Sequence, residues 1–94
     1  MPNVWVPSPM RDVTGGRHTV NIPGKTVREV LANLLERYPE ARQRLLRDDG
    51  SLHPHLMLLA DGVQVDGWDA PLEEDSELVI AAALGGGSVV KAAP

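Results

Sequence analysis

The chain has 94 residues, 43% of them hydrophobic and 23% charged, a composition typical of one globular domain and not of a disordered chain. Nine basic against thirteen acidic residues give a net charge of −4, which disfavours binding to nucleic-acid phosphates. Because the chain has no cysteine, disulfides, thiolate metal sites and cysteine nucleophiles are excluded.

The first half of the chain predicts two strands and a helix. Val4–Val6 is a β-rich run that Pro7 closes, and the alternation of apolar and polar residues over 17–22 indicates a half-buried strand. Thr26 followed by Glu29 fits a capping box at the start of a helix. One apolar stripe follows at helical spacing and is expected to face the core: Val27, Val30, Leu31, Leu34 and Leu35.

The second half predicts a further short helix and three strands. Pro39 ends the first helix, and residues 39–47 suit a short second one. The five apolar residues of Leu56–Ala60 suit a central strand, and Asp61-Gly62 is a type I′ turn signal that sends the chain back from Val63. The last strand is predicted over 77–82.

This order of elements predicts an α+β fold in which the last strand pairs beside the first. The result is a β-grasp, the ubiquitin-like architecture, with a mixed sheet of four to five strands packed on one main helix. Residues 1–84 form this domain, and residues 85–94 are expected to be a flexible, glycine-rich tail without regular structure. The side chains expected to face the helix are Val4, Val6, Val20, Leu56, Leu58, Leu78 and Ile80.

The opposite face of the predicted sheet is the candidate surface for a partner protein. The period of two along a strand puts a second apolar set there, and contiguous exposed apolar residues commonly mark an interaction site. The expected partner-binding residues are Trp5, Met57, Leu59, Val79 and Ala81, together with Gly85 at the start of the tail.

The sequence shows no arrangement of residues that performs catalysis. Its imidazoles are His18, His53 and His55, and its serines do not lie in a nucleophile turn. The spacing His53-Pro54-His55 lacks the further ligands of a selective metal site. We therefore expect a protein that is not an enzyme and that binds no metal or cofactor of its own.

Location is predicted from two further features. The longest apolar run is Leu78–Leu84, whereas a membrane span needs about 20 apolar residues. The N-terminus has neither the basic region nor the apolar stretch of an export signal. We expect a cytoplasmic protein with no nucleic acid and no membrane among its partners.

The three glycines at 85–87 directly follow the last predicted strand. Composition alone is compatible with a plain linker. Their position suggests a second use, because a tail without side chains fits a narrow enzyme channel and leaves an acyl carbon open to attack.

Five segments carry a family resemblance, in this order: Met10-Arg11-Asp12-Val13-Thr14-Gly15-Gly16, then Gly24–Leu31, then Tyr38-Pro39, then Ala60-Asp61-Gly62, and finally Pro71-Leu72, Asp75 and Leu78–Gly87. Together they resemble the small ubiquitin-like sulfur carriers, which include the small subunit of molybdopterin synthase and the thiamine sulfur carrier. The resemblance covers residues 4–87. The family's usual Val-Asn-Gly turn is Ala60-Asp61-Gly62 in this chain.

The resemblance implies a mechanism centred on the glycines. An E1-like enzyme uses ATP to adenylate the terminal glycine carboxylate, and sulfur then replaces AMP to give a thiocarboxylate that a synthase consumes. The corresponding residues here are Gly87 and Gly86. Because Ser88–Pro94 follow, Gly87 has an amide in place of a carboxylate, and the resemblance implies that a JAMM-type metalloprotease cuts between Gly87 and Ser88.

Two other functions fit the same sequence. A ubiquitin-like modifier joins its glycine to protein lysines and shares the fold, the activation chemistry and the tail. A β-grasp binding module uses the fold without any chemistry at the glycines. The biosynthetic pathway that receives sulfur is not encoded in any motif.

Overall fold

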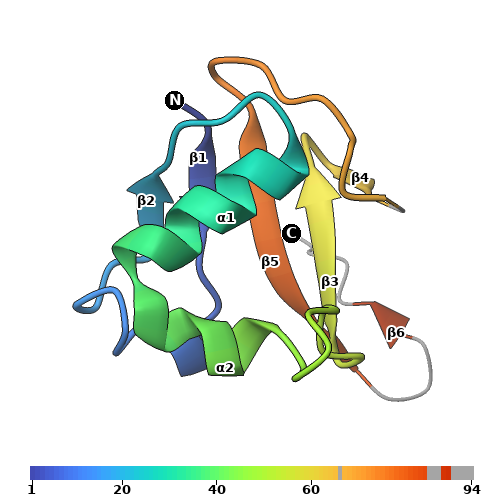
Figure 1. Cartoon of the computed structure of the whole chain (residues 1–94). Helices are drawn as coiled ribbons and strands as arrows, with labels where there is room; N and C mark the ends of the chain where they lie inside the picture. Colours follow the sequence, from blue (N-terminus) through green and yellow to red (C-terminus); the bar gives the residue numbers. More distant parts are fainter. Residues whose placement is uncertain (66, 85–87, 90–94) are drawn as a thin grey trace.

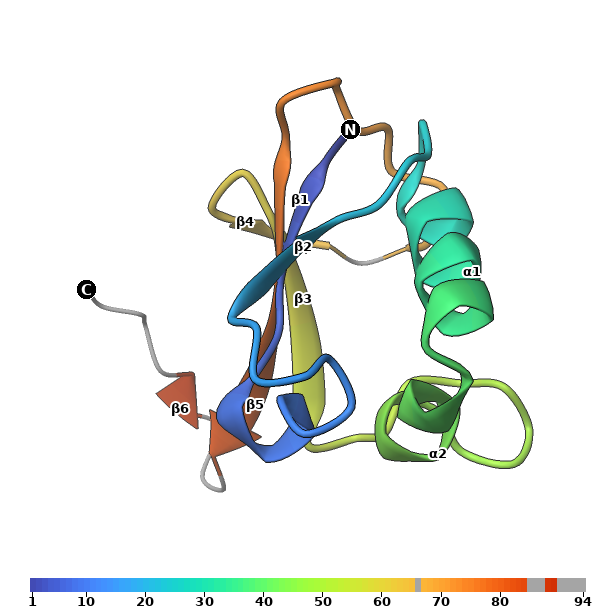
Figure 2. The same cartoon turned by 90° about the vertical axis from the view of Figure 1, so that its left-hand side faces the viewer.

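The computed structural model describes residues 1–65, 67–84 and 88–89. Its main sheet has the strand order β2-β1-β5-β3-β4. The strands are β1 (Asn3–Trp5), β2 (Thr19–Asn21), β3 (Leu56–Ala60), β4 (Val63–Gln64) and β5 (Glu77–Leu84). Both helices cover one face of this sheet (Figures 1 and 2). The predicted α+β fold with a mixed sheet is confirmed.

The centre of the sheet joins the two ends of the domain. β1 and β5 are parallel, with Val4 opposite Leu78, whereas β1–β2, β3–β4 and β3–β5 are antiparallel. A parallel pair requires a crossover, and here everything between β1 and β5 supplies it. The predicted pairing of the first and last strands is therefore confirmed.

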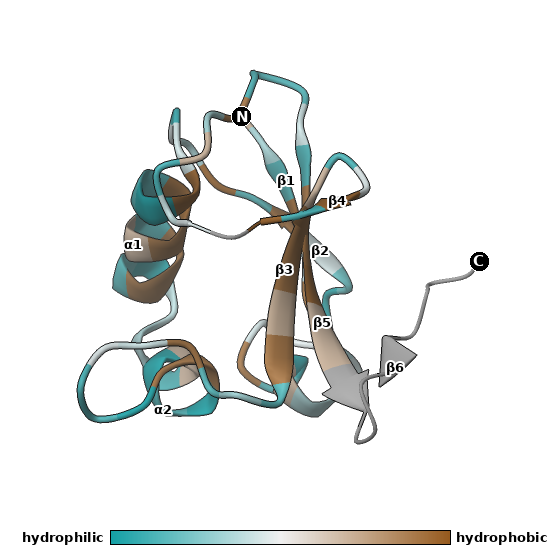
Figure 3. Ribbon diagram, turned by 90° about the vertical axis from the view of Figure 1, so that its right-hand side faces the viewer, coloured by the Kyte–Doolittle hydropathy of each residue, from teal (hydrophilic) through white to brown (hydrophobic). Residues whose placement is uncertain are grey.

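The main helix, α1 (Val27–Arg37), begins at the predicted cap. The backbone N–H of Glu29 donates to Thr26 Oγ1 over 3.2 Å. The Glu29 carboxylate accepts from the backbone N–H of Lys25 at 2.9 Å, one residue earlier than in a standard capping box. The side of α1 turned to the sheet is the apolar one (Figure 3). Helix α1 ends before Pro39, as predicted.

The predicted second helix is present in two pieces. A 3₁₀ turn, η2 (Pro39–Ala41), leads into the short α2 (Arg42–Leu45), and Leu45 and Leu46 are buried as expected. A further 3₁₀ turn, η1 (Ser8–Met10), follows β1. Helix α2 and the segment after β1 lie at the end of the sheet where β5 finishes (Figure 1).

The core lies between α1 and the sheet. The predicted residues Val4, Val6, Val20, Leu58, Leu78 and Ile80 are all buried there, as are Val27, Val30, Leu31 and Leu34 of α1. Leu35 and Leu56 are only partly buried and pack at the edge of this core. Trp68 packs against it from the loop before β5.

The turn between β3 and β4 is fastened to the start of β5. Asp61 and Gly62 both have positive φ, 51° and 86°, as the type I′ prediction requires. One Asp61 carboxylate oxygen accepts from the backbone N–H of Glu77 at 2.9 Å, and the other accepts from the Ser76 hydroxyl at 2.8 Å. These two bonds hold the pKa of Asp61 below its ordinary value.

The end of the chain differs from the sequence prediction. Ser88–Val89 form a short strand, β6, that pairs antiparallel with β5 through Ala83↔Val89 and Leu84↔Ser88. The sequence predicted no regular structure after residue 84. The difference arises because β5 extends beyond its neighbours and offers unpaired backbone groups to any strand that follows.

No helix in the described ranges is long and apolar enough to cross a membrane.

Candidate partner-binding site

The sheet face turned away from α1, here called the outer face, carries one continuous cross-strand row. The pairing registers align its members across all five strands of the main sheet: Thr19, Trp5, Val79, Leu59 and Gln64. Trp5 is 43% exposed, and Val79 and Leu59 are half-buried. The predicted facing of Trp5, Leu59 and Val79 therefore agrees with the registers, and these three residues lie at adjacent positions and are here called the apolar row.

A polar row borders this apolar row toward the start of β5. Asn3 donates to the Glu77 carboxylate at 3.3 Å, and Asn21 donates to the Asn3 side-chain oxygen at 3.3 Å. The Trp5 indole N–H also donates to Glu77. Trp5 is thereby oriented by its polar end, while its ring remains available beside Val79.

The next row of the outer face, toward the end of β5, corrects one prediction. Ala81 lies opposite Met57 on this face and is half-buried. Met57 lies on the predicted face but is only 6% exposed, so it is not an accessible contact. A period of two fixes the face of a side chain but not its exposure. Near the end of β5, strand β6 also lies on the outer-face side of the sheet (Figure 2).

The residues predicted to carry the chemistry are at the chain end. Gly85, Gly86 and Gly87 lie outside the described residues. The predicted cleavage partner Ser88 lies in β6, where it pairs with Leu84. The chain thus passes from the last residue of β5 directly into the glycines.

A groove lies at this same end of the sheet and is here called the tail-root groove. It has a volume of about 280 Å³. Its apolar lining comes from Pro7, Pro9, Met10, Leu56 and Ala82, and its polar lining from Gln43, Arg44, His53 and His55. Ala82 belongs to β5, so the groove adjoins the root of the glycine tail.

Arg44 is held in place at the rim of the tail-root groove. Its guanidinium donates to both carboxylate oxygens of Asp12, at 2.5 and 2.8 Å, and to the Pro9 carbonyl at 2.8 Å. This ion pair lowers the pKa of Asp12 and raises the pKa of Arg44. The bonds also tie the segment after β1 to α2.

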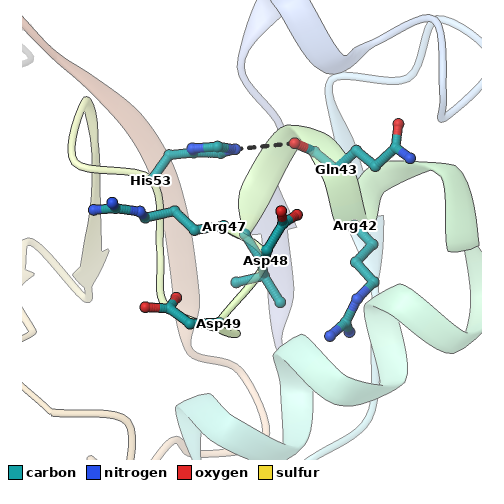
Figure 4. A pocket seen from close by; sticks show the side chains of 7 residues that line it. Arg42, Gln43, Arg47, Asp48, Asp49 and His53 are labelled. Atoms are coloured by element: carbon teal, nitrogen blue, oxygen red, sulfur yellow. Dashed lines mark hydrogen bonds between the residues drawn. The ribbon is translucent and has the colours of Figure 1, made fainter.

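A larger, more open hollow of about 790 Å³ adjoins the groove and shares Gln43 and His53 with it. Its charged side chains do not converge, since Arg42 and Arg47 point away from each other (Figure 4). Asp49 accepts both from the backbone N–H and from the hydroxyl of Ser51, and His53 Nε2 lies 3.0 Å from the Gln43 carbonyl. The hollow therefore holds one hydroxyl–carboxylate contact, Ser51–Asp49, and the bonds from Ser51 lower the pKa of Asp49, which makes it a poor base. Among the described residues, no histidine is hydrogen-bonded to this pair.

His53 and His55 are neighbours, with ring centroids 5.3 Å apart. Within the described part of the chain, no group of three or more histidine and carboxylate side chains is placed to hold a metal ion.

Solved structures of other proteins share this fold. CysO of Amycolatopsis orientalis, in its complex with BexX, matches with a TM-score of 0.80 and 27% identity over 93% of this chain and 100% of that one. CysO of Mycobacterium tuberculosis matches with a TM-score of 0.82 and 24% identity over 89% of this chain and 100% of that one. SAMP1 of Haloferax volcanii matches with a TM-score of 0.73 and 25% identity over 92% and 98%.

The chain has the fold of CysO and SAMP1. The likeness extends over nearly the whole length of each protein, so the predicted β-grasp and the resemblance to the ubiquitin-like carrier family are confirmed. No protein-family model matches the chain, and no curated protein matches it in sequence.

The sequence prediction missed the tail-root groove of this CysO-like fold. Its rim depends on an ion pair between residues 32 positions apart and on two short helical pieces. Local periodicity carries no signal for such a contact. The one available hint was the family-like segment around Met10, whose side chain lines the groove.

Proposed function

We propose that this chain is a sulfur-carrier protein, made as a precursor and acting in the cytoplasm with partner enzymes. The observation that carries the proposal is the passage from β5 at Leu84 straight into three glycines, in a chain with the fold of CysO. The A. orientalis CysO was solved in complex with another protein, BexX, which supports a role exercised through partners.

The proposed chemistry begins with hydrolysis of the Gly87–Ser88 amide by a JAMM-type metalloprotease. Water adds to the acyl carbon, the Ser88 amine leaves, and Gly87 gains a carboxylate. An E1-like enzyme then catalyses the attack of a Gly87 carboxylate oxygen on the α-phosphorus of ATP, and pyrophosphate leaves. Hydrosulfide attacks the acyl-adenylate, AMP leaves, and the thiocarboxylate passes its sulfur to a synthase. ATP is the partner's substrate, and this chain binds no cofactor.

The chain's own contribution is recognition and presentation. The outer face offers Trp5, Leu59, Val79 and Ala81 as contacts for the activating enzyme, and Gly85 begins the segment that enters its channel. Glycine suits this segment because backbone without side chains adopts whatever φ a narrow cleft imposes. Gly86 is the alternative terminus if the protease cuts one residue earlier.

A second candidate is a ubiquitin-like modifier joined to lysines through the same glycine. The likeness to SAMP1, a small archaeal modifier protein, supports it. The two functions diverge after adenylation, since the modifier yields lysine–glycine isopeptides whereas the carrier yields a thiocarboxylate. Peptide mapping of cell proteins for glycine remnants on lysine separates them.

The direct test compares the 94-residue chain with a chain ending at Gly87. Each is incubated with ATP, hydrosulfide and an E1-like enzyme, and intact mass is measured. The buried core residues of the described structure lie between Val4 and Ile80, so the shortened chain keeps its core. We expect an acyl-adenylate and then a thiocarboxylate only on the chain ending at Gly87.

The native cytoplasm provides the matching observation. Intact-mass spectrometry should find a species ending at Gly87, partly with oxygen exchanged for sulfur. If only the uncut chain is present under sulfur demand, the precursor proposal fails and a role as a binding module replaces it.

A further inference from the structure

We propose that the tail-root groove docks an acidic, apolar segment of the partner protein that receives the glycine tail. The inference rests on the proposed function for the partner's identity. Its physical basis is independent, and consists of where the groove lies, what lines it and how charge is distributed over the described residues.

Position links the groove to the tail. Ala82 lines the groove and Leu84 is the last residue of β5. Gly87 follows Ala82 by five positions in the sequence, a span of at most about 18 Å for an extended chain. A partner segment seated in the groove therefore lies within one tail length of the reacting carbon.

The floor of the groove is apolar and well supported. Met10 is 3% exposed, and Leu56 packs at the edge of the core. Ala82 is exposed with a small side chain, which leaves the space that a larger side chain would fill. At about 280 Å³ the groove fits one or two apolar side chains and not a drug-sized molecule, for which sites of roughly 300–1,000 Å³ are usual.

The rim selects a carboxylate. Gln43, Arg44 and His55 carry N–H groups that donate hydrogen bonds, His53 Nε2 is already paired with the Gln43 carbonyl, and none of the described lining residues is acidic. Asp12 offsets part of the Arg44 charge but also fixes the guanidinium, which has more N–H donors than its bonds to Asp12 and Pro9 use.

The charges at the two ends of β5 differ. At the start of the strand, Asp61 accepts from the Ser76 hydroxyl and from the Glu77 backbone N–H, and Ser76 Oγ accepts from the Glu73 backbone N–H, so three acidic residues lie close together there. The end of β5 meets the donor-rich rim, about 25 Å away for a strand of this length. In a chain with more acidic than basic residues, an acidic partner segment is repelled from the start of β5 and accepted at its end.

The test is an NMR titration of the uncut, ¹⁵N-labelled 94-residue chain with the peptide acetyl-Asp-Leu-Leu-Glu-amide. Acetyl-Lys-Leu-Leu-Lys-amide is the charge-reversed control. We expect the acidic peptide to shift the amides of Met10, His55, Leu56 and Ala82 with a dissociation constant of about 1 mM, and the basic peptide to bind at least about tenfold more weakly.

Matched variants locate the binding. Ala82→Glu places a carboxylate inside the groove and should weaken binding of the acidic peptide at least about tenfold. Ala32→Glu makes the same change on the exposed side of α1 and should leave binding unchanged. Gln43→Glu, at an exposed rim position of α2, is a second variant expected to weaken binding if Ala82→Glu does not fold.

The proposal is overturned by the absence of shifts up to about 10 mM peptide, by equal binding of both peptides, or by shifts confined to the outer face. Shifts that grow with protein concentration without peptide assign the groove to a second copy of the chain and also overturn it. Because the titration needs no cleavage and no enzyme, its failure is distinct from failure of the carrier chemistry.

Discussion

Gly24 is the residue whose identity the packing of α1 requires most directly. Its φ is +152°, and an added Cβ would lie 2.6 Å from Val30 Cγ2 and 2.8 Å from the Val30 backbone nitrogen. The nitrogen belongs to the first turn of α1 and cannot rotate away. Gly24→Ala is therefore expected to lower the free energy of unfolding by about 1–3 kcal/mol in chemical denaturation.

The control for this substitution is Gly67→Ala. No heavy atom lies within 4 Å of a Cβ added there, and the change is expected to stay within about 0.5 kcal/mol. Equal effects at both positions would show that the approach of residue 24 to α1 is not what selects glycine.

Asp61 is expected to make the free energy of unfolding depend on pH. The Glu77 backbone N–H and the Ser76 hydroxyl lower its pKa in the folded state, so its stabilisation is present above its ordinary pKa of about 3.9 and is lost as pH falls through the lower, folded value. Asp61→Asn keeps a residue that tolerates positive φ but does not titrate. We expect the variant to lose less unfolding free energy than the wild type between about pH 5 and pH 2.

Thermal unfolding across this pH range measures the effect. Asp75→Asn removes an exposed carboxylate from the turn before β5 and controls for the loss of one charge at this end of the molecule. If wild type and Asp61→Asn lose stability in parallel on acidification, the hydrogen bonds from Ser76 and Glu77 do not discriminate between the two forms of the carboxyl group.

At the scale of elements, the packing of α1 against the sheet stabilises the fold. Leu31 of α1 and Leu58 of β3 are each 2% exposed in the same core. Truncating either to alanine removes transfer energy and leaves a cavity, which should cost about 2–5 kcal/mol in denaturant unfolding. Val63→Ala on β4, where the side chain is 68% exposed, should cost less than about 0.5 kcal/mol. Losses of unfolding free energy below about 1 kcal/mol at both leucines would contradict the assigned register.

The elements themselves were largely predictable because their signals are local. Thr26, the apolar stripe after it and Pro39 define α1, and Asp61-Gly62 defines the β3–β4 turn. Element ends were less predictable: β5 continues to Leu84 and gains β6 as a neighbour. Strand ends depend on which backbone groups remain unpaired, and that is decided by the assembled sheet.

At the scale of the whole molecule, the candidate site was only partly predictable. Alternation along β1, β3 and β5 correctly placed Trp5, Leu59 and Val79 on one face. It could not tell that Met57 on that face is nearly inaccessible. The tail-root groove was missed because segments distant in the sequence form it, joined by the pair Asp12–Arg44.

The outer face leads to the last prediction. Leu59 of β3 lies next to Val79 of β5, which separates it from Trp5 of β1, and Leu59 is half-buried. Leu59→Arg puts a charge into the centre of this row without touching the core on the other face, so the fold should persist. A partner that covers the row must then desolvate an unpaired guanidinium, which typically costs an interface several kcal/mol.

We expect Leu59→Arg to weaken binding of the E1-like enzyme to the chain ending at Gly87 by at least about tenfold in calorimetric titration. Ala32→Arg, on the exposed side of α1, is the matched control because it adds the same charge on the opposite side of the molecule. Unfolding curves of both variants separate lost affinity from lost structure. If a natively folded Leu59→Arg chain keeps its affinity, the outer face is not part of the partner interface. The tail and the tail-root groove would then be the surface that partners bind.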